Sequence, residues 1–374
     1  RARETKMTRQ NPVRETSGLK LGKGVFRFLF ISPANFVGTF ERTTFGLTVI
    51  FPSTHRPMGN WPPDSAYSRS TVMLSFFVPG YDEESGLMPQ FFHVSEQVSA
   101  LMAAFYGKFV VDGGQIQTSA RLAIPQMWEG PCHSFRHPAF NSKARKPGGP
   151  DLNLANFEKL LDVYFTTSWE DETLGRVLRA AEFYRMALEN FQERPEMAYT
   201  LLVSSLEAII DFSDCSDEER YDDKLRSYLE QIAAECINGN EIVANFKQRL
   251  FQVRRRVAKL VDKFIPDAFF QQREADQDFV TVKSREELHT RVLASYDYRS
   301  KLLHTGNRTG IGHLDRSVMG EEYVLGKPLL DDTGLVKILE KCLTLTGLER
   351  VTSAVLRSVI QEKLLPPPWY DPHR

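Results

Sequence analysis

Residues 286–304, with the sequence EELHTRVLASYDYRSKLLH, decide how the second half of this chain folds. Apolar side chains recur every three or four positions, as at Leu288, Val292 and Tyr296, and this spacing is typical of an amphipathic helix. Ser284 is a candidate N-cap, because a serine hydroxyl accepts a hydrogen bond from a free N–H group in the first helical turn. The stretch is therefore expected to be one long helix with one face directed into a core.

The same periodicity extends over most of the chain from Leu174 onward, with short polar breaks between segments. Pro195 fits the first turn of one segment, where its missing N–H group costs nothing. Residues 305–333 form a connection longer than an ordinary loop, which indicates a mobile or functional segment. Residues 174–362 are thus predicted to be an all-α helical bundle, followed by a tail at 363–374. The expected helices span 174–192, 196–212, 221–237, 241–263, 286–304 and 334–362.

The first 140 residues have a different character, with short runs rich in Phe, Val and Thr between Pro and Gly residues. Such runs favour β-strands, and one helix is expected at 95–105. Residues 21–140 are therefore predicted to form a β-rich α+β domain with a recognition or sensor role. The fold class is an α+β two-domain protein, with this domain ahead of the helical bundle. The predicted strands are 26–31, 44–51, 71–78 and 115–124.

Residues 141–150 read NSKARKPGGP, which is basic and lacks apolar periodicity. Together with a short bridging helix at 154–164, they suggest a linker over residues 141–173. Residues 1–20 are basic and polar, and are expected to be disordered or vector-derived, with Met7 as a possible natural start.

Overall composition narrows the class of protein. The 47 basic and 48 acidic residues leave a net charge of −1. This balance argues against a protein whose whole surface binds polyanions. Four cysteines occur without paired spacing, which favours a reducing compartment. No segment has the roughly 20 consecutive apolar residues that span a bilayer. A cytoplasmic protein without a membrane partner is expected.

A charged residue lies within the apolar stripe of residues 286–304. At about 100° per residue, Arg299 falls about 20° from Leu288, near the middle of that stripe. An unpaired guanidinium buried there would be very costly, so Arg299 needs a carboxylate or a phosphate as partner. Glu207 has the matching property, because it lies in the otherwise apolar run AYTLLVSSLEAIID at 198–211. The sequence therefore predicts an ion pair between Glu207 and Arg299.

The segments SLEAII at 205–210 and YDYRSKLLHTG at 296–306 resemble the Apea-like branch of the HEPN superfamily. The resemblance covers about residues 174–361. It implies a helical bundle that dimerises and, where active, cleaves RNA without a metal. It also implies a regulated role in stress response or anti-phage defence, with a β-rich domain often preceding the helices.

The resemblance also implies roles for individual residues. Arg299 and His304 correspond to the two catalytic positions, and Glu207 corresponds to the acidic residue of an early helix. One departure is Thr305, because glycine often follows the histidine directly in the family. The residues expected to support the catalytic pair are Tyr296, Asp297, Ser300 and Lys301.

RNA cleavage suits these residue types. The 2′-hydroxyl of RNA can attack the adjacent phosphate if one group removes its proton and another protonates the departing 5′-oxygen. His304 can move protons near neutral pH, and Arg299 can clamp a phosphate with its planar fork of N–H groups. A single histidine cannot easily serve both sides of one phosphate, so a homodimer that supplies a second His304 is expected. No cofactor is needed, and the trigger or ligand of the first domain is unknown.

Other interpretations remain open. Arg299 and His304 could instead be a structural ion pair and a helix-capping histidine, in a non-catalytic HEPN-like scaffold that binds a partner or nucleic acid. The basic residues Arg254, Arg255, Arg256 and Lys259 could form a solvated helix face or an RNA-binding surface that follows the phosphates.

A metal site is also possible at one place in the sequence. Cys132, His133 and His137 lie close together in PCHSFRHP, and all three are of types that bind zinc. A fourth ligand at suitable spacing is missing, so no metal site is predicted.

Overall fold

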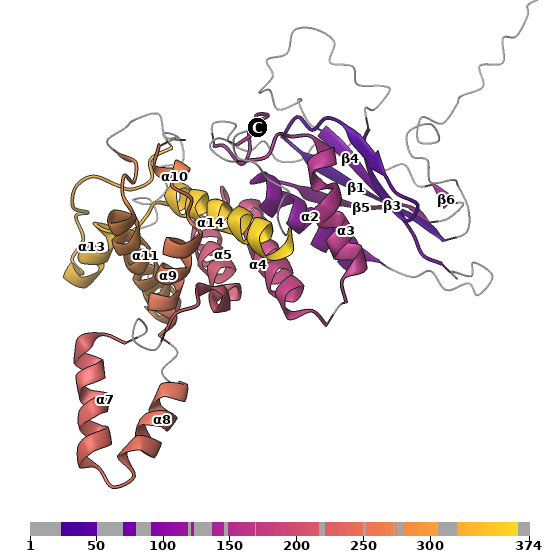
Figure 1. Cartoon of the computed structure of the whole chain (residues 1–374). Coiled ribbons are helices and arrows are strands. Elements are labelled where there is room, and N and C mark those ends of the chain that lie inside the picture. The colour runs from indigo at the N-terminus through magenta and orange to yellow at the C-terminus, as the bar shows by residue number, and fades with distance from the viewer. Residues whose placement is uncertain are drawn as a thin grey trace, which may run out of the picture. The chain divides into compact units, whose positions relative to one another are not determined.

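A computed structural model describes residues 24–50, 70–79, 91–118, 121–122, 137–145, 149–168, 170–216, 221–249, 252–271, 274, 280–305 and 320–365. The chain divides into two compact units, Arg1–Asp171 (unit 1) and Glu172–Arg374 (unit 2) (Figure 1). Residues 1–20 and the tail at 366–374, both named in the sequence-based predictions, lie outside the described residues.

Unit 1 is built on a six-stranded antiparallel sheet with the strand order β2-β3-β4-β1-β5-β6. Phe26, Phe28 and Phe30 of β1 are fully buried, because β1 lies inside the sheet with β4 and β5 on its two sides. The predicted strands 26–31, 44–51 and 71–78 are confirmed where they are described, as β1, β3 and β4. The prediction of one strand at 115–124 is wrong, because this segment contains the end of β5 and then β6, which pairs antiparallel with β5. The strands are β1 (Val25–Ser32), β2 (Thr39–Glu41), β3 (Phe45–Ile50), β4 (Ser70–Phe77), β5 (Val111–Thr118) and β6 (Arg121–Leu122).

Helices add the remaining core of unit 1. The predicted helix at 95–105 is confirmed as α2 (Phe92–Tyr106), which is buried along most of its length. The predicted bridging helix is found as a 3-10 turn, η2 (Leu154–Phe157), followed by α3 (Glu158–Thr166). Both lie within unit 1.

The interpretation of residues 141–173 as a linker needs correction, because the described part of this segment up to Asp171 belongs to unit 1. The Tyr106 hydroxyl donates to the Asn153 carbonyl oxygen at 2.8 Å, and the Phe45 and Phe165 rings stack 5.0 Å apart. Leu160 and Leu161 are fully buried. The apolar face of α3 thus becomes part of the core, which a sequence reading of the preceding Pro-Gly-Gly-Pro does not reveal.

Unit 2 is helical, so the coarse prediction of a β-rich unit followed by helices is confirmed. The carboxy-terminal helix α14 packs against α4, α5 and α9 to form its centre. The elements are α4 (Glu172–Glu189), α5 (Pro195–Ala208), η3 (Ile210–Ser213), α7 (Asp223–Glu235), α8 (Gly239–Arg249), α9 (Val253–Phe264), α10 (Ala268–Gln271), α11 (Arg285–Thr305), α13 (Thr333–Leu339), α14 (Leu345–Val359) and η6 (Ile360–Leu364).

Two predicted helices are each divided in the structure. The segment 241–263 contains α8 and α9, with Gln252 in the left-handed conformation at φ 46° where α9 begins. The segment 334–362 contains α13 and α14, because the Thr344 hydroxyl accepts a hydrogen bond from the Gly347 N–H and starts a new helix. Helical periodicity continues across both breaks, so it does not locate them.

Two predicted helix starts are confirmed. Pro195 occupies the first turn of α5, and the Ser284 hydroxyl accepts a hydrogen bond from the Glu287 N–H at 3.2 Å as α11 begins. Among the described residues, no helix combines the length and apolar character needed to cross a membrane.

Candidate active site on helix α11

The predicted ion pair joins α5 and α11. The Arg299 Nη2 atom lies 2.8 Å from the Glu207 Oε2 atom. The Arg299 side chain is 19% exposed and the Glu207 side chain is 23% exposed, so the pair is partly shielded from water. Glu207 therefore holds the guanidinium of Arg299 in one position at the surface of the bundle.

The buried face of α11 is rotated slightly from the face that the helical wheel indicates. Leu288, Val292 and Tyr298 are buried, whereas Leu303 is 55% exposed. Arg299 thus lies at the edge of the apolar stripe and not at its centre. This position explains why the ion pair is only partly buried.

Tyr296 completes a small cluster with Glu207 and Arg299. Its ring centroid lies 5.8 Å from the Arg299 guanidinium carbon, and its hydroxyl hydrogen-bonds to Glu207. Burial and the adjacent Glu207 carboxylate raise the pKa of the Tyr296 hydroxyl, so this group is neutral and donates its proton to Glu207. Glu207 is thereby held from two sides.

Two further residues of the motif attach α11 to neighbouring helices. Asp297 accepts from Arg254 Nη2 of α9 at 2.8 Å, and Lys301 pairs with Asp332, the N-cap of α13. Ser300 is half-buried. The alternating charges at 297, 299 and 301 therefore fix α11 against α9, α5 and α13, respectively.

His304 lies exposed in the last turn of α11. Among the described residues, which stop at 305 and resume at 320, no hydrogen bond or ion pair involves its ring. His304 lies five positions after Arg299 on the helix, which corresponds to about 140° around the axis and about 7.5 Å along it. Within one copy of the chain, the two side chains thus leave α11 in different directions.

The three arginines in the basic run of α9 form ion pairs with aspartates of the same unit. Arg254 pairs with Asp297, Arg255 pairs with Asp222 at 3.2 Å, and Arg256 pairs with Asp211. Burial alone would raise the pKa of the Asp211 carboxyl, but Arg256 and Arg176 outweigh burial and lower that pKa. Lys259 is half-buried. The predicted RNA-binding arginines are therefore not an open cationic surface, and RNA binding through them remains a prediction.

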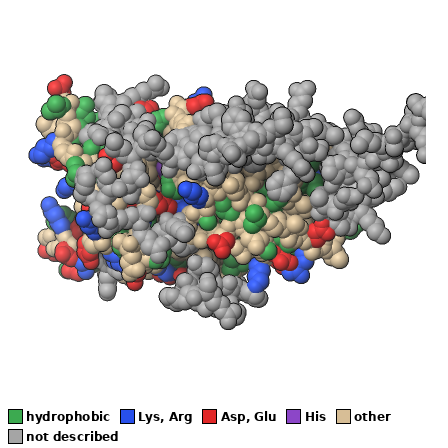
Figure 2. Space-filling model, turned by 90° about the horizontal axis from the view of Figure 1, so that it is seen from above, with side chains coloured by type: hydrophobic (Ala, Val, Ile, Leu, Met, Phe, Trp, Pro, Cys, Tyr) green, Lys and Arg blue, Asp and Glu red, His purple; other side chains and the backbone are tan. Residues whose placement is uncertain are grey.

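Charges are also mixed on the larger scale. On the face drawn in Figure 2, acidic and basic side chains of the described residues are interspersed. They do not gather there into one basic patch. This distribution agrees with the near-zero net charge of the chain.

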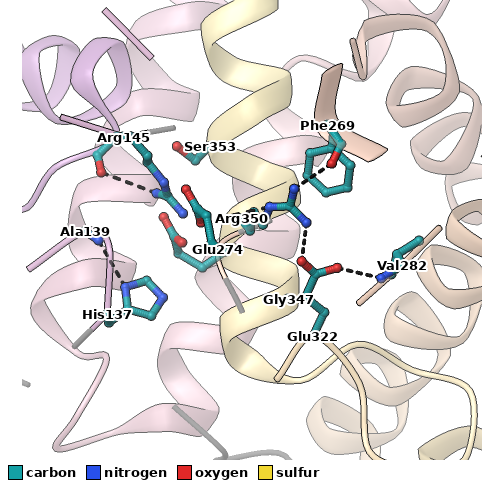
Figure 3. A network of polar contacts seen from close by, with 12 residues as sticks. His137, Ala139, Arg145, Phe269, Glu274, Val282, Glu322, Gly347, Arg350 and Ser353 are labelled. Atoms are coloured by element: carbon teal, nitrogen blue, oxygen red, sulfur yellow. Dashed lines mark hydrogen bonds and ion pairs between the residues drawn. The ribbon is translucent and has the colours of Figure 1, made fainter. Parts of the chain in front are cut away.

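A second, more deeply buried charge pair lies at the centre of unit 2. Arg350 of α14 is 3% exposed and pairs with Glu322, which is 2% exposed (Figure 3). Arg350 Nη2 also donates to the Phe269 carbonyl oxygen at 2.6 Å, and its guanidinium lies 3.8 Å from the centroid of the Phe269 ring. The Glu322 Oε2 atom accepts from the Val282 N–H at 2.8 Å.

Close packing makes this pair possible. A Cβ atom on Gly347 would lie 2.3 Å from the Glu322 carbonyl oxygen, so only glycine lets α14 approach the segment that carries Glu322. Burial raises the pKa of the Glu322 carboxyl, although Arg350 acts in the opposite direction. The Arg350–Glu322 pair was not among the features predicted from the sequence. The run LERVTSAVL at 348–356 carries the same signal as the segments around Glu207 and Arg299, namely charges within an apolar helix.

The possible metal-binding segment has an ordinary structural role where it is described. His137 is 1% exposed, and its Nδ1 atom accepts from the Ala139 N–H at 3.2 Å (Figure 3). Cys132 and His133 lie outside the described residues. In the described parts of the chain, no three His, Cys, Asp or Glu side chains are grouped so that they could hold a metal ion.

The fold and the site define an α+β chain whose helical unit carries an ion-paired arginine and an exposed histidine on one helix. No family model, curated protein or solved structure matches this chain. The resemblance to the HEPN superfamily therefore depends on the segments at 205–210 and 296–306.

We expect the Glu207–Arg299 pair to contribute measurably to stability. A fully buried pair loses about 3–5 kcal/mol when one partner is removed, and an exposed pair loses less than about 1 kcal/mol. Because both side chains are about one-fifth exposed, Arg299→Ala should cost about 1–3 kcal/mol. Urea unfolding of Arg299→Ala, Glu207→Ala and the double variant would measure the coupling. Fully additive effects would contradict a pair that contributes to stability.

Proposed function

We propose that this protein is a metal-independent endoribonuclease of HEPN type that acts in the cytoplasm as a regulated stress or anti-phage defence effector. The observation that carries the proposal is the arrangement of α11, where Glu207 fixes Arg299 and His304 is exposed five residues later. The class of reaction, RNA cleavage without a metal, is what the resemblance of residues 205–210 and 296–306 to the HEPN superfamily implies. The β-rich unit 1 is proposed to sense the trigger.

Arg299 is suited to bind a phosphate while it remains attached to Glu207. The pair uses Nη2, and among the described residues no hydrogen bond uses Nη1. An arginine cannot lose its proton at any physiological pH, so it offers positive charge to the developing phosphorane throughout the reaction. Glu207 and Tyr296 act as positioning residues, because their described contacts are with the Arg299 guanidinium and with each other.

His304 is proposed to move the protons. It removes the proton from the 2′-hydroxyl, whose oxygen attacks the adjacent phosphorus. The bond from phosphorus to the 5′-oxygen breaks, and a second imidazolium protonates that oxygen. The products are a 2′,3′-cyclic phosphate and a 5′-hydroxyl end. A second His304 from another copy of the chain would supply this acid.

We expect the active form to be a two-fold homodimer with the His304 segments facing across a cleft. The directions of Arg299 and His304 differ by about 140° on one helix, so one copy does not direct both at a single phosphate. Light scattering should find a dimer, and the rate per chain should fall when dilution dissociates it. A monomer with full cleavage activity would show that this arrangement is wrong.

The experiment that tests the reaction is cleavage of a fluorescent RNA by the purified protein in EDTA, beside DNA of the same sequence. RNA should be cut and DNA should remain intact, since DNA lacks the attacking 2′-hydroxyl. Equal cleavage of both, or loss of activity in EDTA, would contradict the mechanism.

A second candidate is a non-catalytic HEPN-like scaffold that binds a partner or nucleic acid. The ion pairs of Arg254, Arg255 and Arg256 favour it, because an RNase would benefit from free cations beside its site. Binding of RNA without cleavage, unchanged by His304→Ala, would support the scaffold.

A further inference from the structure

Helices α7 and α8 form a hairpin that Figure 1 shows apart from the other helices of unit 2. The turn between α7 and α8 is tightly packed. Asn238 has φ 60°, and a Cβ atom on Gly239 would lie 2.3 Å from the Ile232 carbonyl oxygen. At the other end, the Tyr221 hydroxyl donates to the Lys247 carbonyl oxygen at 3.3 Å. The hairpin is therefore a defined part of the fold.

This hairpin buries little of its own apolar surface. Its helices have 13 and 11 residues, and isolated helices of this length are only marginally stable in water. Leu229 is buried, but Tyr228 is 51% exposed, Phe246 is 46% exposed and Ile237 is 91% exposed. Large apolar side chains at this density indicate a surface that a partner covers.

The outer face of α7 carries four exposed residues at helical spacing, Lys224, Tyr228, Gln231 and Glu235. Two contacts show that they share this face. The Lys224 ammonium lies 5.8 Å from the centroid of the Tyr228 ring, and the Gln231 amide donates to Glu235 at 3.2 Å. We name these four residues the outer stripe. Its amino-terminal end is positive, its middle contains an exposed aromatic ring, and its carboxy-terminal end is negative.

We propose that the outer stripe is a docking surface for the same stripe of a second copy of this chain, with the two α7 helices antiparallel. A two-fold interface must be self-complementary. An axis that passes midway along the stripe places Lys224 opposite Glu235 of the second copy, and the reverse pair forms by symmetry. The two Tyr228 rings then meet the two Gln231 side chains near the axis.

The charges of the hairpin disfavour a parallel pairing of two α7 helices and disfavour nucleic acid as a partner. A parallel pairing would place lysine against lysine and glutamate against glutamate. Residues 227–246 contain Glu230, Glu235 and Glu241 and no Lys or Arg, so this part of the hairpin repels the phosphates of nucleic acid. A single helical hairpin offers a small interface, so a weak dimer is expected. This proposal does not depend on the RNA-cleaving activity.

The first test is Tyr228→Asp in the full chain, with Ala234→Asp as its matched control. Ala234 is exposed on α7 about 90° around the helix axis from the outer stripe, so its variant adds the same charge outside the stripe. Sedimentation velocity over a range of concentrations should show at least a tenfold weaker association, or an assembly of half the mass, for Tyr228→Asp. Ala234→Asp should behave as the parent, and circular dichroism should show both variants folded. A parent that stays monomeric up to about 100 μM, or unchanged association of Tyr228→Asp, would overturn the proposal.

The second test distinguishes antiparallel docking from any other contact. Glu235→Lys and Lys224→Glu should each weaken self-association about three- to tenfold at low salt, because like charges then face each other. A mixture of the two variants should associate as well as the parent. In that mixed dimer, the two substituted positions face each other with opposite charges, and the native pair forms on the other side of the axis. Failure of the mixture to recover association would contradict antiparallel docking.

Discussion

Replacing His304 with alanine is expected to slow RNA cleavage about 10²- to 10⁴-fold, the range that general acid–base catalysis contributes. The substitution removes the proton-transfer group but none of the contacts described for the fold, since His304 is exposed at the end of α11. Circular dichroism and thermal unfolding of the variant should therefore match the parent. The rate is measured with a fluorescent RNA in EDTA, under single-turnover conditions.

The same helix offers a matched control. His289 also lies on α11, where its Nδ1 atom is 2.7 Å from the Asp262 carboxylate. His289→Ala should retain most of the cleavage rate, although it removes this contact. If His289→Ala and His304→Ala lose activity equally, the loss reflects damage to α11 and not catalysis by His304.

A companion variant separates charge from shape at the phosphate clamp. Arg299→Lys keeps the positive charge but loses the planar fork that holds two phosphate oxygens, so cleavage should be strongly impaired. Arg254→Lys, on the paired run of α9, should have a small effect. Wild-type rates for Arg299→Lys would show that Arg299 is a structural residue.

The largest expected effect on stability comes from Arg350→Met. The change leaves Glu322, which is 2% exposed, without its counter-charge, and such a loss costs about 3–5 kcal/mol. The double variant Arg350→Met/Glu322→Gln should recover part of this loss, because a neutral amide needs no counter-charge. The recovery should be incomplete, since the Glu274 carboxylate, 4.0 Å from the Arg350 Nε atom and 9% exposed, also loses this neighbour. Urea unfolding measures both. Arg254→Met, in a pair whose side chains are 41% and 36% exposed, should cost less than about 1 kcal/mol and serves as control.

The effect of Arg350→Met should also depend on pH. Burial raises the pKa of Glu322 in the folded protein above the ordinary value of 4.5, so the folded state holds this proton more tightly than the unfolded state. Stability from this group is therefore present at low pH and is lost as the pH rises through the folded-state pKa. The destabilisation by Arg350→Met should shrink as the pH is lowered toward 4.5. A pH-independent loss would contradict the buried carboxylate as its cause.

The segments that the sequence predicts well are those where one local signal is sufficient. Strand β1 follows from a run of aromatic residues, and the starts of α5 and α11 follow from Pro195 and Ser284. The Glu207–Arg299 pair could be predicted because each helix carries one charge of opposite sign inside an apolar run. The strand and the two helix starts depend on a few neighbouring residues. The Glu207–Arg299 pair joins residues that are 92 positions apart, and it was predictable only because each charge is unusual within its own helix.

Other features depend on parts of the chain that are distant in sequence. Arg350 meets Glu322 because a chain segment passes over Gly347 at very short distance, and no periodicity in either segment encodes that crossing. The arginines of α9 look like a cationic surface in the sequence, but Asp211, Asp222 and Asp297 approach them from other elements.

By itself, the sequence determined the order of a β-rich unit and a helical unit and most of the helices, and it indicated the candidate residues for the proposed chemistry. Only the tertiary structure decided where Gln252 and Thr344 divide predicted helices, and that residues 149–171 belong to unit 1. It also decided that Arg299 lies at the edge of the buried face and leaves α11 in a different direction from His304. The physical reason is that periodicity reports which side of a helix is apolar, whereas burial and charge pairing depend on which other elements meet that side.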